Sequence, residues 1–148
     1  MYIEKMDMSD FELIKNNLKS DFDDFWNENI LEQELLNNER IYLVAKSKET
    51  NEILGFAGIS FVLDEAELMN IVTKKNKRGL GIGKALLEKI INICMEKQIK
   101  FLKLEVNEKN IPAINLYKSV GFKQTGVREK YYNNCDSAIL MDLEIFVK

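Results

Sequence analysis

The sequence predicts an α+β protein, a mixed sheet with helices on both faces, and three observations lead there. Helical and strand patterns are interleaved along the chain. Where a helical segment joins two strands, those strands can pair in parallel. The 148 residues are 46% apolar and 30% charged with one proline, a composition typical of a globular chain, so a single domain over residues 1–148 is expected.

Two helices and then three strands are predicted in the N-terminal half. Ser9-Asp10-Phe11-Glu12 has the form of a capping box, and Phe11, Ile14 and Leu18 follow at helical spacing. A second helix is predicted over about residues 27–38. Short apolar runs then predict strands over residues 41–45, 53–62 and 67–72, with a turn at 49–52.

The C-terminal half alternates between helices and strands. Residues 84–97 are strongly helical, and one apolar stripe is expected from Leu86, Leu87, Ile90, Ile91, Cys94 and Met95. Residues 101–106 form a strand pattern. Asn110 is predicted to cap a short helix with Pro112 in its first turn, which Gly121 ends. The last two strands are predicted over residues 122–127 and 138–145.

Charge and composition exclude several functions. The net charge of −3 argues against a general nucleic-acid binder. The chain has no histidine, which removes Ser/His and Cys/His nucleophiles and most zinc sites, so no metal is expected. Cys94 and Cys135 lack metal-type spacing and are expected as free thiols. Without a long apolar run or a signal peptide, the protein is expected to be soluble and cytoplasmic, with no membrane partner.

A basic, glycine-rich loop between a strand and a helix is the first functional signal. Gly79, Gly81 and Gly83 lie just before the strong helical pattern, where free backbone N–H groups and the helix dipole favour an anion. Glycine lets a ligand approach the backbone closely. Lys77, Arg78 and Lys84 add positive charge at the same place. A pyrophosphate group would fit this loop, whereas the alternative interpretation is a merely flexible basic loop.

Two nucleotide motifs fail at this loop. A Walker A loop needs a glycine five residues before Gly83 and Ser or Thr after Lys84, but Arg78 and Ala85 stand there. A Rossmann loop needs a GxGxxG spacing in a first βαβ unit, whereas here the spacing is GxGxG in mid-chain.

The run Arg78-Gly79-Leu80-Gly81-Ile82-Gly83 resembles the Arg/Gln-x-x-Gly-x-Gly/Ala loop of the GCN5-related N-acetyltransferase (GNAT) superfamily. The resemblance implies an α/β sandwich whose largely antiparallel sheet has a central splayed parallel strand pair. It also implies acetyl-CoA as cosubstrate, bound by Ile71, Val72, Thr73, Arg78, Gly79, Leu80, Gly81, Ile82, Gly83, Lys84, Asn110 and Tyr117.

The segment from Asn110 to Phe122 is similar to the Asn-x-x-Ala-x-x-Leu-Tyr-x-x-x-Gly-Phe segment of the same superfamily. This implies that Asn110 contacts the pantetheine arm and that Tyr117, near the thioester sulfur, is the general acid. The alternatives are that Asn110 is only an N-cap and Tyr117 only a core aromatic.

The resemblance also implies that Glu105 is the general base. Glu105 shares one face of the strand 101–106 with Lys103. From spacing alone, a crevice-lining carboxylate and a solvated one are equally favoured.

At a finer level the chain resembles the RimI family of ribosomal-protein alanine N-acetyltransferases. The similar runs are residues 63–71, 104–106, 110–122, 128–132 and 136–141, while Asn107 stands where that family often has arginine. The resemblance implies direct attack by the N-terminal amine of a ribosomal protein, with the Val72 N–H as oxyanion donor. The alternatives are an acetyltransferase for another peptide or small amine, and a non-catalytic acyl-CoA-binding module.

Overall fold

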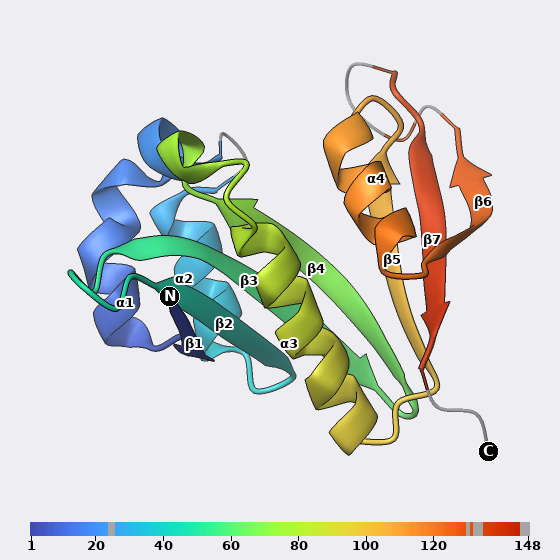
Figure 1. Cartoon of the computed structure of the whole chain (residues 1–148), viewed down its shortest axis with the longest axis horizontal. Coiled ribbons are helices and arrows are strands. Elements are labelled where there is room, and N and C mark those ends of the chain that lie inside the picture. The colour runs from blue at the N-terminus through green and yellow to red at the C-terminus, as the bar shows by residue number, and fades with distance from the viewer. Residues whose placement is uncertain (24–25, 130, 132–134, 146–148) are drawn as a thin grey trace. The chain divides into compact units, whose positions relative to one another are not determined.

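The computed structural model describes residues 1–23, 26–129, 131 and 135–145. Within them, seven strands form one sheet in the order β1-β2-β3-β4-β5-β7-β6 (Figure 1). The chain divides into two compact units. The first unit comprises Met1–Phe61 and Leu68–Asn92, and the second comprises Val62–Glu67 and Ile93–Lys148.

The first unit is built on three antiparallel strands and the larger part of a fourth. Tyr2 pairs with Lys46 between β1 and β2, and Arg40 pairs with Ser60 between β2 and β3. The elements that lie wholly or mainly in this unit are β1 (Tyr2–Lys5), α1 (Met8–Ile14), α2 (Glu28–Leu36), β2 (Arg40–Lys46), β3 (Ile53–Val62), β4 (Glu65–Thr73) and α3 (Ile82–Glu96).

The second unit contains the parallel strand pair. The first residues of β4 pair in parallel with β5, from Glu65 opposite Phe101 to Glu67 opposite Lys103. β7 lies between β5 and β6 and is antiparallel to both. The elements are β5 (Phe101–Asn107), α4 (Ile111–Ser119), β6 (Lys123–Arg128) and β7 (Ala138–Glu144). The predicted mixed sheet with a parallel pair is therefore confirmed.

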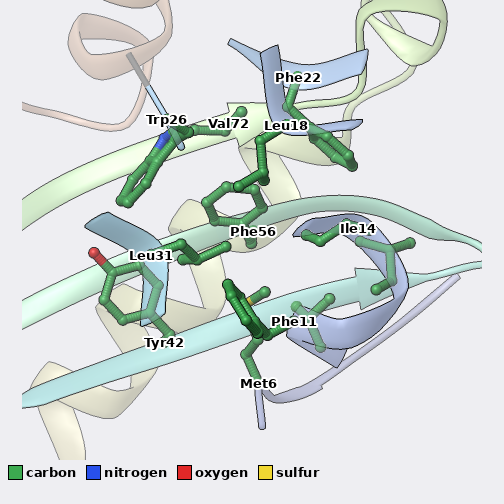
Figure 2. Packing of buried hydrophobic residues seen from close by; sticks show 12 residues of the cluster. Met6, Phe11, Ile14, Leu18, Phe22, Trp26, Leu31, Tyr42, Phe56 and Val72 are labelled. Carbon is green, nitrogen blue, oxygen red and sulfur yellow. The ribbon is translucent and has the colours of Figure 1, made fainter. Parts of the chain in front are cut away.

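An aromatic core holds the first unit together (Figure 2). The Trp26 ring lies edge-on to Phe56 of β3 at 5.3 Å and to Tyr42 of β2 at 6.2 Å. Phe22 also packs against Phe56, with the two ring centres 5.6 Å apart. Val72, close to the end of β4, belongs to the same cluster. Burial of these side chains therefore fixes the end of β4 in position.

Helices cover both faces of the sheet in the first unit. Phe56 faces the core formed with α1 and α2. Its neighbour Gly55 faces the start of α3, because a Cβ built there would lie 3.1 Å from Ile82 Cγ2. Successive residues of a strand point to opposite faces, so α3 covers the face opposite α1 and α2.

The N-terminus differs from the prediction in two ways. β1 was not predicted, because its four residues are partly or fully exposed and form a strand only by pairing with β2. The predicted capping box at Ser9 is wrong, because Asp7 is the N-cap of α1. Asp7 Oδ1 accepts hydrogen bonds from the N–H groups of Ser9 and Asp10 at 2.9 and 3.1 Å, and the Asp7 N–H donates to Asp10 Oδ2 at 3.0 Å.

Buried Asp10 also takes part in an ion pair that joins the first elements of the chain. Its Oδ1 lies 2.7 Å from Lys46 Nζ on β2, and the same ammonium lies 2.7 Å from Glu4 on β1. The two carboxylates raise the pKa of Lys46. One lysine thereby links β1, α1 and β2.

The other elements agree closely with prediction. β3 occupies the predicted residues 53–62, and the remaining boundaries lie within two residues of the predicted ones. α1 is the exception, since it ends at Ile14 and is followed by a 3₁₀ turn (Lys15–Asn17) and a π turn (Leu18–Phe22). Met95, predicted in the apolar stripe of α3, is 56% exposed. Among the described helices, none has the length and apolar character needed to cross a bilayer.

Candidate active site

The glycine loop of the first unit has an open backbone. After β4 ends at Thr73, a 3₁₀ turn (Lys75–Lys77) leads to Gly79 and Gly81, whose φ angles are +79° and +83°. Other residues rarely adopt this conformation. A Cβ built at either glycine would have no described atom within 4 Å. Backbone conformation therefore requires these glycines, and space for a ligand lies beside them.

The start of α3 presents to the same space backbone donors that have no acceptor within the helix. The Ala85 N–H donates to the Gly81 carbonyl at 3.0 Å. The N–H groups of Ile82, Gly83 and Lys84 precede it and so have no acceptor within the helix. Together with the helix dipole they make a suitable site for a phosphate group.

Some basic side chains around the loop attach it to the rest of the unit, and others are accessible to an anion. Lys74 pairs with Glu52 at 2.9 Å, and this hydrogen bond lowers the pKa of the Glu52 carboxyl. Lys75 Nζ donates to the Lys19 carbonyl at 3.0 Å, and both contacts attach the loop to the rest of the unit. Arg78 donates one hydrogen bond to the Phe22 carbonyl at 3.3 Å. Arg78 and Lys84 are exposed, so their cationic groups are accessible to an anion.

Gly55 sets the position of this loop, and sequence reasoning missed it. A Cβ at Gly55 would lie 2.6 Å from the carbonyl oxygen of Val72. The Lys74 N–H also donates to the Leu54 carbonyl at 2.8 Å. Only a glycine allows β3 to approach the end of β4 this closely. No local pattern in the sequence could have indicated it, since the contact joins residues 17 positions apart.

Glu105 lies on β5 in the second unit, on the wall of a cavity of about 240 Å³. Its side chain is 27% exposed, and its Oε1 lies 2.8 Å from Arg128 Nη2. The Arg128 guanidinium in turn lies over the Tyr131 ring, 5.0 Å from its centre. The remaining cavity wall comes from Glu67, Lys103, Leu104, Thr125, Leu140 and Asp142. A carboxylate with access to solvent can accept a proton from a bound amine.

Asn110 and Tyr117 both belong to α4. Asn110 is its N-cap, and Asn110 Oδ1 accepts from the Ala113 N–H at 3.3 Å, so the predicted capping role is confirmed. Tyr117 is 8% exposed and its ring lies 5.6 Å from Phe122. Tyr117 is therefore a core aromatic residue, as the alternative interpretation predicted. Its role as an acid stays a prediction.

Asn107 connects two loops of the second unit. Its Nδ2 donates to Asp136 Oδ2 at 3.2 Å, and Lys109 Nζ lies 3.1 Å from Asp136 Oδ1. The Glu108 N–H donates to the Ser137 carbonyl at 2.9 Å, and the Ser137 N–H donates back to the Glu108 carboxylate. The residue that departs from the family pattern thus holds the segment before α4 against the segment before β7.

The predicted site residues belong to both compact units. Residues 71–73 and 78–84 all belong to the first unit, whereas Glu105, Asn110 and Tyr117 belong to the second. Arg128 was predicted only as part of a similar run, and its pairing with Glu105 was missed because it depends on strand register. Lys130 and Tyr132 of that run lie outside the described residues.

Known proteins resemble this chain in sequence and in fold. The profile of the acetyltransferase (GNAT) family matches residues 3–122. A [ribosomal protein bS18]-alanine N-acetyltransferase of Haemophilus influenzae is 45% identical over 91 residues, which are 62% of each chain. A Bacillus subtilis protein, provisionally given the same activity, is 31% identical over 140 residues, 94% of this chain and 92% of its own. The crystal structure of the Escherichia coli ribosomal-protein-S18-alanine N-acetyltransferase has a TM-score of 0.87 at 28% identity, covering 99% of this chain and 95% of that one.

Proposed function

Because this chain belongs to the acetyltransferase (GNAT) family, we propose that it transfers the acetyl group of acetyl-CoA to the N-terminal alanine of a small-subunit ribosomal protein of the bS18 type. The names of its Haemophilus and Escherichia relatives give that substrate for those proteins. The observation that carries the proposal is the open glycine turn at the start of α3, with three backbone donors and exposed cationic side chains.

The diphosphate of acetyl-CoA is proposed to bind this turn. The N–H groups of Ile82, Gly83 and Lys84 would donate to its oxygens, and Arg78 and Lys84 would neutralise charge. Arg78 uses one guanidinium donor on the Phe22 carbonyl, and a guanidinium has five. Residues 71–73, Asn110 and Tyr117 are proposed to bind the rest of the molecule.

Glu105 is proposed as the base and Tyr117 as the acid. An N-terminal amine has a pKa of about 7.7–8.0, so about a tenth of the amine is already neutral at pH 7. For the protonated fraction, a carboxylate needs to remove only one proton. The amine nitrogen forms a bond to the acetyl carbon, and the carbon–sulfur bond breaks. Glu105 takes the proton from nitrogen, Tyr117 gives one to the thiolate, and the Val72 N–H stabilises the oxyanion.

The acceptor proposal is tested by release of CoA thiol with peptides and free amines. We expect a hexapeptide that begins with alanine to be acetylated at its first residue, and spermidine and lysine to react much more slowly. A lysine side chain, with a pKa near 10.4, is a far harder amine for the same base to deprotonate. Preference for a free amine would contradict the acceptor. Absence of CoA release with every amine would favour a non-catalytic acyl-CoA-binding module.

Two substitutions test the proposed residues. Glu105→Gln should lose most turnover at neutral pH while acetyl-CoA binding persists, and Tyr117→Phe should lower turnover at similar affinity. An unchanged rate in Glu105→Gln would remove that residue from catalysis. A collapse of affinity in Tyr117→Phe would leave it as a packing residue, as its contact with Phe122 allows.

One domain in the cytoplasm is the proposed setting. The family match over residues 3–122 includes parts of both compact units, which supports their acting together. A ribosomal substrate supports a cytoplasmic location. The net charge of −3 supports recognition of the protein substrate rather than of nucleic acid.

A further inference from the structure

Arg128 has no part in the proposed mechanism, yet it contacts the proposed base. Its Nη2 donates to Glu105 Oε1 at 2.8 Å, and its side chain is 54% exposed. We propose that Arg128 is a positioning residue, which fixes the plane of the Glu105 carboxylate so that Oε2 meets the acceptor amine in one orientation. This inference rests on the proposed function, because it requires Glu105 to act on the acceptor.

Strand register brings the two side chains together. Glu105 lies opposite Leu140 on β7, and Arg128 lies opposite Ala138 on the same strand. Directly opposite residues share a face, as do residues two apart on one strand. Glu105 and Arg128 therefore project from the same face, with β7 between their strands. Two strand spacings are about 9–10 Å, a gap that an arginine can bridge above the small side chain of Ala138.

The ion pair with Arg128 restricts the rotation of the Glu105 carboxylate. The terminal torsion of a glutamate is broad, so a partly exposed carboxylate samples many orientations. A charge-assisted hydrogen bond from a guanidinium narrows that range. The Tyr131 ring, 5.0 Å below the guanidinium, braces Arg128 in turn. Across the described residues, Glu105 Oε2 has no hydrogen-bond partner, so this oxygen remains available to the amine.

The alternative is that the pair only stabilises the fold. Ion pairs with an exposed partner contribute little to stability. On that alternative, removing Arg128 should lower the melting temperature slightly and leave turnover unchanged, whereas a positioning role predicts lower turnover at an unchanged melting temperature. Measuring kcat and the melting temperature of the same variant therefore distinguishes a positioning role from a purely stabilising one.

The first experiment compares Arg128→Gln with Lys123→Gln, which removes a positive charge from the same strand without touching Glu105. With an alanine-first hexapeptide we expect Arg128→Gln to lower kcat by about 10- to 100-fold, the effect of a misplaced catalytic group. The KM for acetyl-CoA and the melting temperature should stay at wild-type values. Arg128→Lys should recover only part of the rate, because an ammonium lacks the planar fork. Lys123→Gln should behave as wild type.

A double-mutant cycle with Glu105→Gln gives the decisive result. Rates are measured in single turnovers with enzyme in excess, so that slow variants remain measurable. If Arg128 acts through Glu105, adding Arg128→Gln to Glu105→Gln should change the rate less than about twofold. An equal loss in both backgrounds, or a wild-type kcat for Arg128→Gln, would overturn the positioning role alone. A wild-type rate for Glu105→Gln would overturn the base assignment and this inference with it.

Discussion

Cys94 and Cys135 differ sharply in their surroundings, although both are free thiols as the sequence predicted. Cys94 is buried, and because a thiolate is poorly solvated there, burial raises its pKa from 9.0 to about 11. We expect a thiol reagent at pH 8 to modify Cys135 quickly and Cys94 only after unfolding. Mass spectrometry of the modified protein measures this, and equal rates for both cysteines would contradict the burial.

The same shift affects stability in alkali. The raised pKa means that the folded state favours the neutral thiol of Cys94. The contribution of this thiol to the free energy of unfolding is therefore complete below pH 9 and is lost as the pH rises towards about 11. The midpoint of urea unfolding of the wild type should therefore fall across this range by more than that of Cys94→Ala.

Gly81 and Gly121 share a left-handed conformation, with φ of +83° and +106°, but differ in proposed function. Replacement of either by alanine should cost about 1–2 kcal/mol of stability, because a Cβ disfavours positive φ. Only Gly81→Ala should weaken acetyl-CoA binding, since Gly121 ends α4 rather than lining the glycine turn. Calorimetric titration checks this difference. Wild-type affinity in Gly81→Ala would count against the loop as the diphosphate site.

At the scale of whole elements, the close approach of β3 to the end of β4 decides where the glycine turn begins. Gly55→Ala should destabilise the protein by about 1–3 kcal/mol, since the new methyl would meet the rigid Val72 carbonyl. Gly126→Ala is the matched control, because its methyl would meet only the Leu140 side chain, at 3.3 Å. Chemical denaturation measures both. Equal losses of stability in the two variants would show that the backbone of β4 moves aside as easily as the Leu140 side chain.

Acetyl-CoA binding concerns the molecule as a whole, because the proposed contacts come from both compact units. At a concentration of about 100 times its Kd, acetyl-CoA should raise the free energy of unfolding by about 2.7 kcal/mol. Hydrogen exchange should show protection at the start of α3 and also at the start of α4. Protection confined to the first unit would contradict the proposed roles of Asn110 and Tyr117.

Several features of the whole chain could be read from the sequence because their causes are local. The helical period of residues 84–97 predicts α3, and Asn110 caps α4 through its own neighbour Ala113. The glycine turn follows from three glycines and adjacent cations. Such patterns also gave the family resemblance, which the comparisons confirm.

Other features depended on partners far along the chain. The strand Tyr2–Lys5 exists only through β2, Gly55 is required only by Val72, and Glu105 meets Arg128 only through the register of β5, β7 and β6. The sequence by itself determined most of the elements and the chemistry of the loop, since hydrogen bonds and torsions between near neighbours dictate both. Tertiary structure decided the close approaches and the ion pair at the base, since packing and strand register select contacts that no local pattern specifies.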